Sequence, residues 1–306
     1  MNVFESTDPR SYDSRERGPQ DIREAGGRGP GEVFVRGLNL PHGPDREPVQ
    51  AAAGGREYAL RGSEVRALAS IGAFRVVAAD DLRDDRGRPG DVRHGDLERL
   101  REASLIRTVA PLDRQAHTTI VTLTEHGRAL LEGHRMPGIE RPQTFFDGAV
   151  KPRELSHDAQ AYRAFVRTAD RIQSDGGRID RVILDYELKR DYQRFLQERN
   201  RGRAGSDGRP TRTRDEIKAW AREHDLPLVD GRLQFPDFRI EYEHPDGRRD
   251  VEDVEITTLH YRGAHASGKV AAGFTRFRAS TARIGGSNGH RGGAPFDPHG
   301  AEEFLG

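Results

Sequence analysis

The stretch QFPDFRIEYEHPDGRRDVEDVEITT, residues 234–258, decides the fold of the second half of the chain. Two runs of alternating apolar and charged residues flank residues 245–247, Pro-Asp-Gly, which are preferred in a three-residue hairpin loop. Proline presets the first turn position, and glycine accepts the left-handed third position. The loop therefore pairs His244 with Arg248 and sets the register of both strands.

Counting outward from this loop predicts which residues face each other. The expected pairs on the charged face are Glu243 with Arg249, Arg239 with Asp253, and Asp237 with Glu255. The other face sets Phe238 against Val254 and is the core side. The first two charged pairs are complementary, but Asp237 and Glu255 place two carboxylates opposite each other, which is destabilising if nothing lies between them.

An opposed carboxylate pair either raises one pKa or holds a divalent cation. Mg²⁺ or Mn²⁺ bound in this way keeps several waters and can activate one of them for attack on a phosphodiester. We therefore expect Asp237 and Glu255 to be metal ligands and catalytic residues. The alternative is a solvated acidic patch, neutralised by an arginine such as Arg262.

The composition excludes several other classes of protein. The 306 residues contain no cysteine, which rules out disulfides and thiolate metal sites. No apolar run approaches the roughly 20 residues of a transmembrane helix, so we expect a cytoplasmic protein without membrane contact. The net charge is zero, so the chain as a whole is not drawn to DNA. Lysine is rare beside arginine and occurs at positions 151, 189, 218 and 269.

The sequence pattern of residues 1–135 predicts a DNA-binding module preceded by a flexible arm. Residues 1–56 lack sustained periodicity and are expected to be flexible, except that residues 33–35 could dock as a short strand. Residues 57–135 have the order of a winged helix-turn-helix: three helices, a two-stranded ribbon and a closing helix. The expected DNA contacts are on the third helix and the ribbon tip: Arg93, His94, Arg99, Arg114 and His117. Winged helices also serve as dimerisation or protein-docking modules, which is the alternative.

The second half predicts an α/β domain. A break over residues 136–152 is expected to be a linker, residues 153–284 alternate helix and strand patterns, and residues 285–306 are expected to be a disordered tail. The overall fold class is thus α/β (α+β overall), with an N-terminal winged helix and a C-terminal α/β core.

Pro236-Asp237, followed across a hairpin by Glu255, resembles the PD-(D/E)xK nuclease superfamily, whose restriction-endonuclease-like core is such a meander flanked by helices. The order of winged helix, linker and this core, over residues 58–280, is similar to the replication-relaxation family found near conjugation and plasmid genes. The similarity includes the run DYELKR at residues 185–190. It implies DNA, with replication or conjugation proteins, as partners.

The chain departs from the superfamily pattern two residues after Glu255, where Thr257 replaces the lysine. Lys269 is the expected substitute, in the first turn of a helix whose buried stripe is Val270, Phe274 and Phe277; an ordinary surface lysine is the alternative. Glu187 is a candidate third acidic ligand; the alternative is a helix-start glutamate favoured by the dipole. His157 and Asp158 are interpreted as helix capping.

These features of the sequence lead to three hypotheses about function. The first is a Mg²⁺- or Mn²⁺-dependent DNA endonuclease or nicking accessory linked to plasmid replication or transfer. In it Asp237, Glu255 and Glu187 bind the metal, and Lys269 stabilises the phosphoryl charge. The second is a non-catalytic DNA-binding regulator built on a decayed nuclease fold. The third is a protein-docking adaptor.

Overall fold

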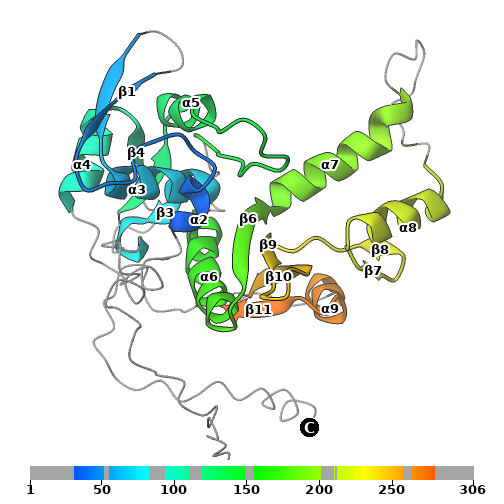
Figure 1. Ribbon diagram of the computed structural model, residues 1–306. Coiled ribbons are helices and arrows are strands. Elements are labelled where there is room, and N and C mark those ends of the chain that lie inside the picture. The colour runs from blue at the N-terminus through cyan, green and yellow to red at the C-terminus, as the bar shows by residue number, and fades with distance from the viewer. Residues whose placement is uncertain are drawn as a thin grey trace, which may run out of the picture.

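The computed structural model describes residues 31–51, 55–82, 94–109, 119–148, 155–200, 210, 212–257 and 264–279, without the side chains of residues 94, 156 and 264–267. These residues form a mixed α/β protein, as predicted (Figure 1). None of their helices is long and apolar enough to cross a membrane. The predicted tail and the first thirty residues of the predicted arm lie outside the described residues.

The N-terminal half combines helices with two small antiparallel sheets, one formed by β1 and β2 and one in the order β3-β5-β4. Its elements in chain order are α2 (Glu32–Val35), β1 (Glu47–Gln50), β2 (Glu57–Leu60), α3 (Gly62–Ala73), β3 (Val77–Ala78), η1 (Ala79–Asp81), α4 (His94–Glu102), β4 (Ile106–Val109), β5 (Ile120–Leu123) and α5 (Glu125–Gly133). The predicted ribbon is present as β4 and β5, and the hydroxyl of Thr124 caps α5 by accepting the N–H of Gly127.

The prediction of a flexible arm is wrong for the residues of it that the structure describes, 31–51, 55 and 56. Residues 33–35 form a turn of helix rather than a strand, and all three side chains are buried. Further on, β1 pairs with β2 because Val49 and Tyr58 face the same core from opposite strands. Arg46 also bonds the buried Glu64 of α3 at 2.6 Å. This part of the arm is packed structure.

The C-terminal half is built on a four-stranded sheet in the order β11-β10-β9-β6. Its elements in chain order are α6 (Leu155–Ser174), β6 (Arg178–Leu184), α7 (Asp185–Gln197), η3 (Glu198–Asn200), α8 (Arg214–Glu223), β7 (Leu228–Val229), β8 (Arg232–Leu233), β9 (Phe238–Glu243), β10 (Arg249–Thr257), α9 (Ala264–Ala271) and β11 (Thr275–Arg278). β6, β9 and β10 are antiparallel neighbours, and β11 runs parallel to β10.

The predicted hairpin register is confirmed. The N–H of His244 donates to the carbonyl of Arg248 at 2.8 Å, and Gly247 has a positive φ of 83°. The predicted pairs Glu243–Arg249, Arg239–Asp253 and Phe238–Val254 are all partners in the ladder. Arg239 also bonds both carboxylate oxygens of Asp253, at 2.7 and 2.8 Å.

The two halves share one hydrophobic core, so the predicted linker does not separate independent bodies. The ring of Phe74, which follows α3, lies 5.1 Å from that of Phe165 in α6 and 6.2 Å from that of Phe238 in β9, measured between centroids. Figure 1 shows α6 between the N-terminal elements and the sheet. Within the linker, Phe145 is buried, and the Gln143 side chain bonds the backbone of the edge strand β6.

The last helix is shorter than predicted. α9 ends at Ala271, and Gly273 has a φ of 77° that few other residues tolerate, so the chain turns there. Phe277 then lies in β11 rather than on a helical stripe, and Val270 is 52% exposed rather than buried. Lys269 consequently lies in the last turn of α9, where a cation is favoured by the helix dipole.

Candidate functional site

Hydrogen bonds on both sides hold Asp237 at the end of the sheet, directly before β9. Its N–H donates to the carbonyl of Val254 at 3.0 Å, and its carbonyl accepts the N–H of Asp185 at 3.0 Å. Its carboxylate oxygen Oδ2 accepts the N–H of Ile256 at 2.7 Å. The carboxylate therefore lies against the peptide that joins Glu255 to Ile256, although the ladder ends at Phe238–Val254 and does not include the predicted Asp237–Glu255 pair.

Glu255 and Lys269 form a buried ion pair next to Asp237. Nζ of Lys269 lies 2.6 Å from Oε2 of Glu255, and the two side chains are 11% and 3% exposed. Lys269 also donates to the carbonyl of Phe235, two residues before Asp237. Buried charges are tolerated when they are paired and hydrogen-bonded, as here. The structure thus brings together three of the four predicted catalytic residues.

His157 belongs to the same cluster, which the capping interpretation missed. Its Nε2 lies 3.3 Å from Oδ2 of Asp237, and its Nδ1 lies 3.5 Å from Oδ1 of Asp158. His157 is near the start of α6 and Asp237 precedes β9, so only the packing of α6 against the sheet joins them. No spacing in the sequence signals this contact.

These neighbours determine the charge states in the cluster. Burial by itself raises the pKa of Asp237, but the hydrogen bond and charge of His157, the N–H of Ile256 and the charge of Lys269 hold that pKa below its usual value. Hydrogen bonds to Asp158 and Asp237 raise the pKa of His157 to about 10. At neutral pH, Asp237 is therefore a carboxylate and His157 an imidazolium. Among the described residues, Oδ1 of Asp237 has no hydrogen-bond donor.

The structure places Glu187 away from this cluster. It lies in the first turn of α7, where its Oε1 accepts the N–H of Leu184 at 3.2 Å and its Oε2 accepts the hydroxyl of Thr144 at 2.5 Å. Burial raises the pKa of Glu187, although both hydrogen bonds oppose that rise. These contacts are those of the helix-start glutamate that the sequence offered as the alternative.

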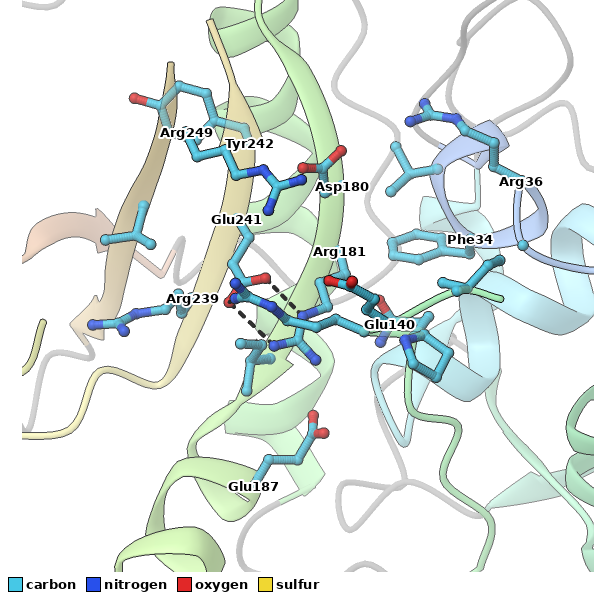
Figure 2. A pocket seen from close by; sticks show the side chains of 18 of the residues that line it. Phe34, Arg36, Glu140, Asp180, Arg181, Glu187, Arg239, Glu241, Tyr242 and Arg249 are labelled. Atoms are coloured by element: carbon cyan, nitrogen blue, oxygen red, sulfur yellow. Dashed lines mark hydrogen bonds and ion pairs between the residues drawn. The ribbon is translucent and has the colours of Figure 1, made fainter. Parts of the chain in front are cut away.

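Glu187 instead lines a cavity of about 1160 Å³ beside β6 and β9. Figure 2 shows it below the ion pair of Arg181 with Glu241, whose two contacts measure 2.8 and 3.1 Å. The neighbouring Arg239 is held by Asp253 and by two carbonyls of the α8 end. The arginines at the centre of this cavity thus have acidic or carbonyl partners within the protein.

The predicted DNA contacts are only partly described. Arg93, Arg114 and His117, and the side chain of His94, lie outside the described residues. Arg99 lies on α4 with 57% of its side chain exposed and its Nε 3.6 Å from Oε1 of Glu64. It remains accessible to a phosphate despite that acidic neighbour.

Across the described residues, no group of three or more histidine, aspartate and glutamate side chains is arranged to hold a metal ion. Glu187 therefore does not complete a three-carboxylate site with Asp237 and Glu255. Mg²⁺ requires fewer protein ligands, because one or two carboxylates with waters and substrate phosphates usually suffice. The ionised Asp237, with an oxygen that no described donor occupies, and the adjacent Glu255 fit that requirement.

In comparisons with models of protein families, with curated proteins and with solved structures, nothing matches this chain.

Proposed function

We propose that this protein is a metal-dependent DNA endonuclease of the nicking type, acting in plasmid replication or transfer, with its cleavage site at Asp237, Glu255 and Lys269. The observation that carries the proposal is the ion pair of Lys269 with Glu255 beside Asp237. A PD-(D/E)xK nuclease uses an aspartate that follows a proline, a glutamate on the next strand and a lysine. Here the lysine forms an ion pair with that glutamate. Here the lysine comes from α9 rather than from β10.

Each residue has a role that its surroundings support. Asp237 and Glu255 would hold Mg²⁺ or Mn²⁺, which when bound supplies an activated water and neutralises charge on the phosphodiester. Lys269 is a cation fixed by two acceptors, so it can stabilise negative charge that develops on the phosphate without reorganising. The pKa of Asp237 is low enough that no proton competes with a metal at neutral pH.

The N-terminal half supports delivery to DNA. Its chain order of helix, short strand, helix and two-stranded ribbon, with a sheet in the order β3-β5-β4, is consistent with the predicted winged helix and supports the proposal. In this proposal α4, the next described helix after η1, is the recognition helix. Asp96 at its first turn is 2% exposed and bonded by Arg61 and Ser63, which anchors α4 to α3.

A plasmid-nicking assay tests the proposed chemistry. Supercoiled plasmid is incubated with the protein and Mn²⁺ or Mg²⁺, and open circles are counted over time. We expect nicking by wild type and its loss in Asp237→Asn and Glu255→Gln, which retain the shape of each side chain. Asp250→Ala is the matched control, since Asp250 is an exposed acid of the same strand as Glu255. An inactive wild type, or nicking by the two site variants, would contradict the proposal.

The contact with DNA has its own test. Replacing Arg99 with alanine should weaken binding to duplexes of any sequence and lower the slope of log K against log salt by about 1, because one phosphate contact is lost. Arg194→Ala is the control, since this exposed arginine lies on α7. Equal slopes in wild type and Arg99→Ala would remove Arg99 from the interface.

A second function is favoured by one observation. Lys269 and Glu255 neutralise each other's charge in the protein interior, a structural role that needs no catalysis and that a non-catalytic DNA-binding regulator on a nuclease scaffold would share. Salt-sensitive DNA binding without nicking would identify that regulator. Absence of both activities would leave the protein-docking adaptor.

A further inference from the structure

A continuous chain of contacts connects the N-terminal half to Asp237. The hydroxyl of Thr122, on β5, donates to the carbonyl of Arg75 at 2.6 Å. Nη1 of Arg75 lies 3.5 Å from Oδ2 of Asp158, whose other oxygen faces Nδ1 of His157 at 3.5 Å. Nε2 of His157 then reaches Asp237 at 3.3 Å. The chain begins on a strand of the ribbon and ends on the carboxylate of the proposed cleavage site.

The first link of this chain is rigid. Arg75 has a φ of 64°, a left-handed conformation that a residue other than glycine keeps only when its surroundings impose it. Thr122, which holds the Arg75 carbonyl, is fully buried. Phe74 and Val76 on either side are also buried in the core. The backbone from which the guanidinium extends towards α6 is therefore fixed by the packing of α3 against β5.

The last link determines which oxygen of Asp237 is available. Two groups contact Oδ2 of Asp237: the N–H of Ile256, on β10, and Nε2 of His157, on α6. Two contacts on one oxygen fix the rotation of the carboxylate. Oδ1, for which the described residues provide no donor, is then the oxygen presented to a ligand. Capping of α6 by His157 does not require a contact with Asp237, so this contact calls for a separate explanation.

Resting on the proposed function, we propose that His157 is a positioning residue for cleavage. It holds Oδ2 of Asp237 so that Oδ1 is presented to the reacting groups, and Asp158 and Arg75 hold His157 in turn. Through this chain the N-terminal half, which the proposed function assigns to DNA binding, sets the geometry of the cleavage site.

The test is steady-state plasmid nicking with Mn²⁺, with kcat and KM determined separately. His157→Ala should lower kcat about 10- to 100-fold, as is usual when a group that orients a metal ligand is removed, with KM for plasmid unchanged. His157→Gln should recover most of the lost kcat, because the glutamine amide offers an N–H donor near the position of the imidazole Nε2. His244→Ala is the matched control, since His244 also pairs with an aspartate, at 3.2 Å, but at the hairpin loop.

The link to the N-terminal half is tested at Arg75. Arg75→Asn removes the guanidinium and retains a residue that tolerates positive φ, so the fold is preserved. It should lower kcat by about 2- to 30-fold, less than His157→Ala, again without a change in KM. Arg75→Lys, which keeps a cation, should lose less than Arg75→Asn. Melting temperatures verify that each variant is folded.

Each result bears on a separate claim. Wild-type kcat in His157→Ala would overturn the positioning role and leave the proposed nuclease standing, and so would a His157→Gln variant as impaired as the alanine variant. Wild-type kcat in Arg75→Asn would overturn the link to the N-terminal half. A wild type that does not nick would overturn the proposed function and this inference with it.

Discussion

Asp237 and Glu187 flank the same end of the sheet, where Leu184 of β6 pairs with Phe238 of β9. Both carboxylates are well buried, but their surroundings differ. Asp237 has the charges of His157 and Lys269 near it, and its pKa is lowered. Glu187 has a neutral hydroxyl and a backbone N–H as hydrogen-bond partners. Burial raises its pKa, and these bonds and the more weakly acting charges of Arg181 and Arg190 only partly oppose that rise.

The difference shows that burial does not by itself decide what a carboxylate does. Where cations are packed around it, the ionised form is stabilised, so no proton has to leave before a ligand binds. Where the direct hydrogen-bond partners are neutral, as at Glu187, the nearby charges of Arg181 and Arg190 do not overcome the cost of burial. The sequence predicts that Asp237 and Glu187 share one metal site. In the structure Asp237 lies beside His157 and Lys269, whereas Glu187 is the helix-start glutamate of α7.

The largest effect is expected at the cation of the Asp237 cluster. Lys269→Met removes the ammonium from Glu255, whose side chain is 3% exposed, and should lower the free energy of unfolding by about 3–5 kcal/mol in urea titrations. Lys189→Met is the control. The pair of Lys189 with Asp185 is 55% and 35% exposed, so its loss should cost under about 1 kcal/mol. Similar losses in both variants would show that the buried pair contributes no more than a surface pair.

An intermediate effect is expected near Glu187. The side chain of Gln143 donates to the carbonyl of Val182 and accepts its N–H, both at 2.9 Å, and so covers the edge of β6. Gln143→Ala should lower the free energy of unfolding by about 1–3 kcal/mol, because two backbone groups lose their partners. Gln50→Ala, at an exposed position, should change it by less than about 0.5 kcal/mol. An equally small change at both positions would mean that water replaces Gln143 without cost.

The smallest effect is expected at Glu187 itself. Its pKa is raised in the folded state, so the stability that its protonated form contributes is complete below the ordinary value and is lost as pH rises through the folded pKa. In Glu187→Gln the amide oxygen can still accept the N–H of Leu184, and the amide nitrogen can donate to the hydroxyl of Thr144. This variant should therefore raise the free energy of unfolding at pH 7 by on the order of 1 kcal/mol. The gain should vanish at acid pH. Destabilisation at pH 7 would show that the ionised form is favoured after all.

Much of the hairpin could be predicted because its determinants are local. Residues 245–247 fix the loop, and the strict alternation of side chains then places Asp237 beside β10 without tertiary information. The scarcity of lysine beside arginine distinguishes Lys269 in the sequence, whereas its contact with Glu255 is visible only in the structure.

The rest depended on packing between distant segments. His157 reaches Asp237 only because α6 crosses the sheet, and Phe74 joins both halves into one core through partners that no periodicity identifies. The end of α9 did have a signal in Gly273, but the apolar spacing of Phe274 and Phe277 suggested a longer helix. Periodicity alone could not distinguish a short helix followed by a parallel strand from one continuous helix.

Calorimetric titration of the protein with Mn²⁺ in the absence of DNA measures directly whether Asp237 belongs to a metal site. We expect saturable binding to wild type, its loss in Asp237→Asn, and wild-type binding in Glu187→Gln, since only Asp237 combines a lowered pKa with an oxygen that no described donor occupies. Saturable binding that survives Asp237→Asn, or no binding to wild type, would contradict a metal site at Asp237 and Glu255.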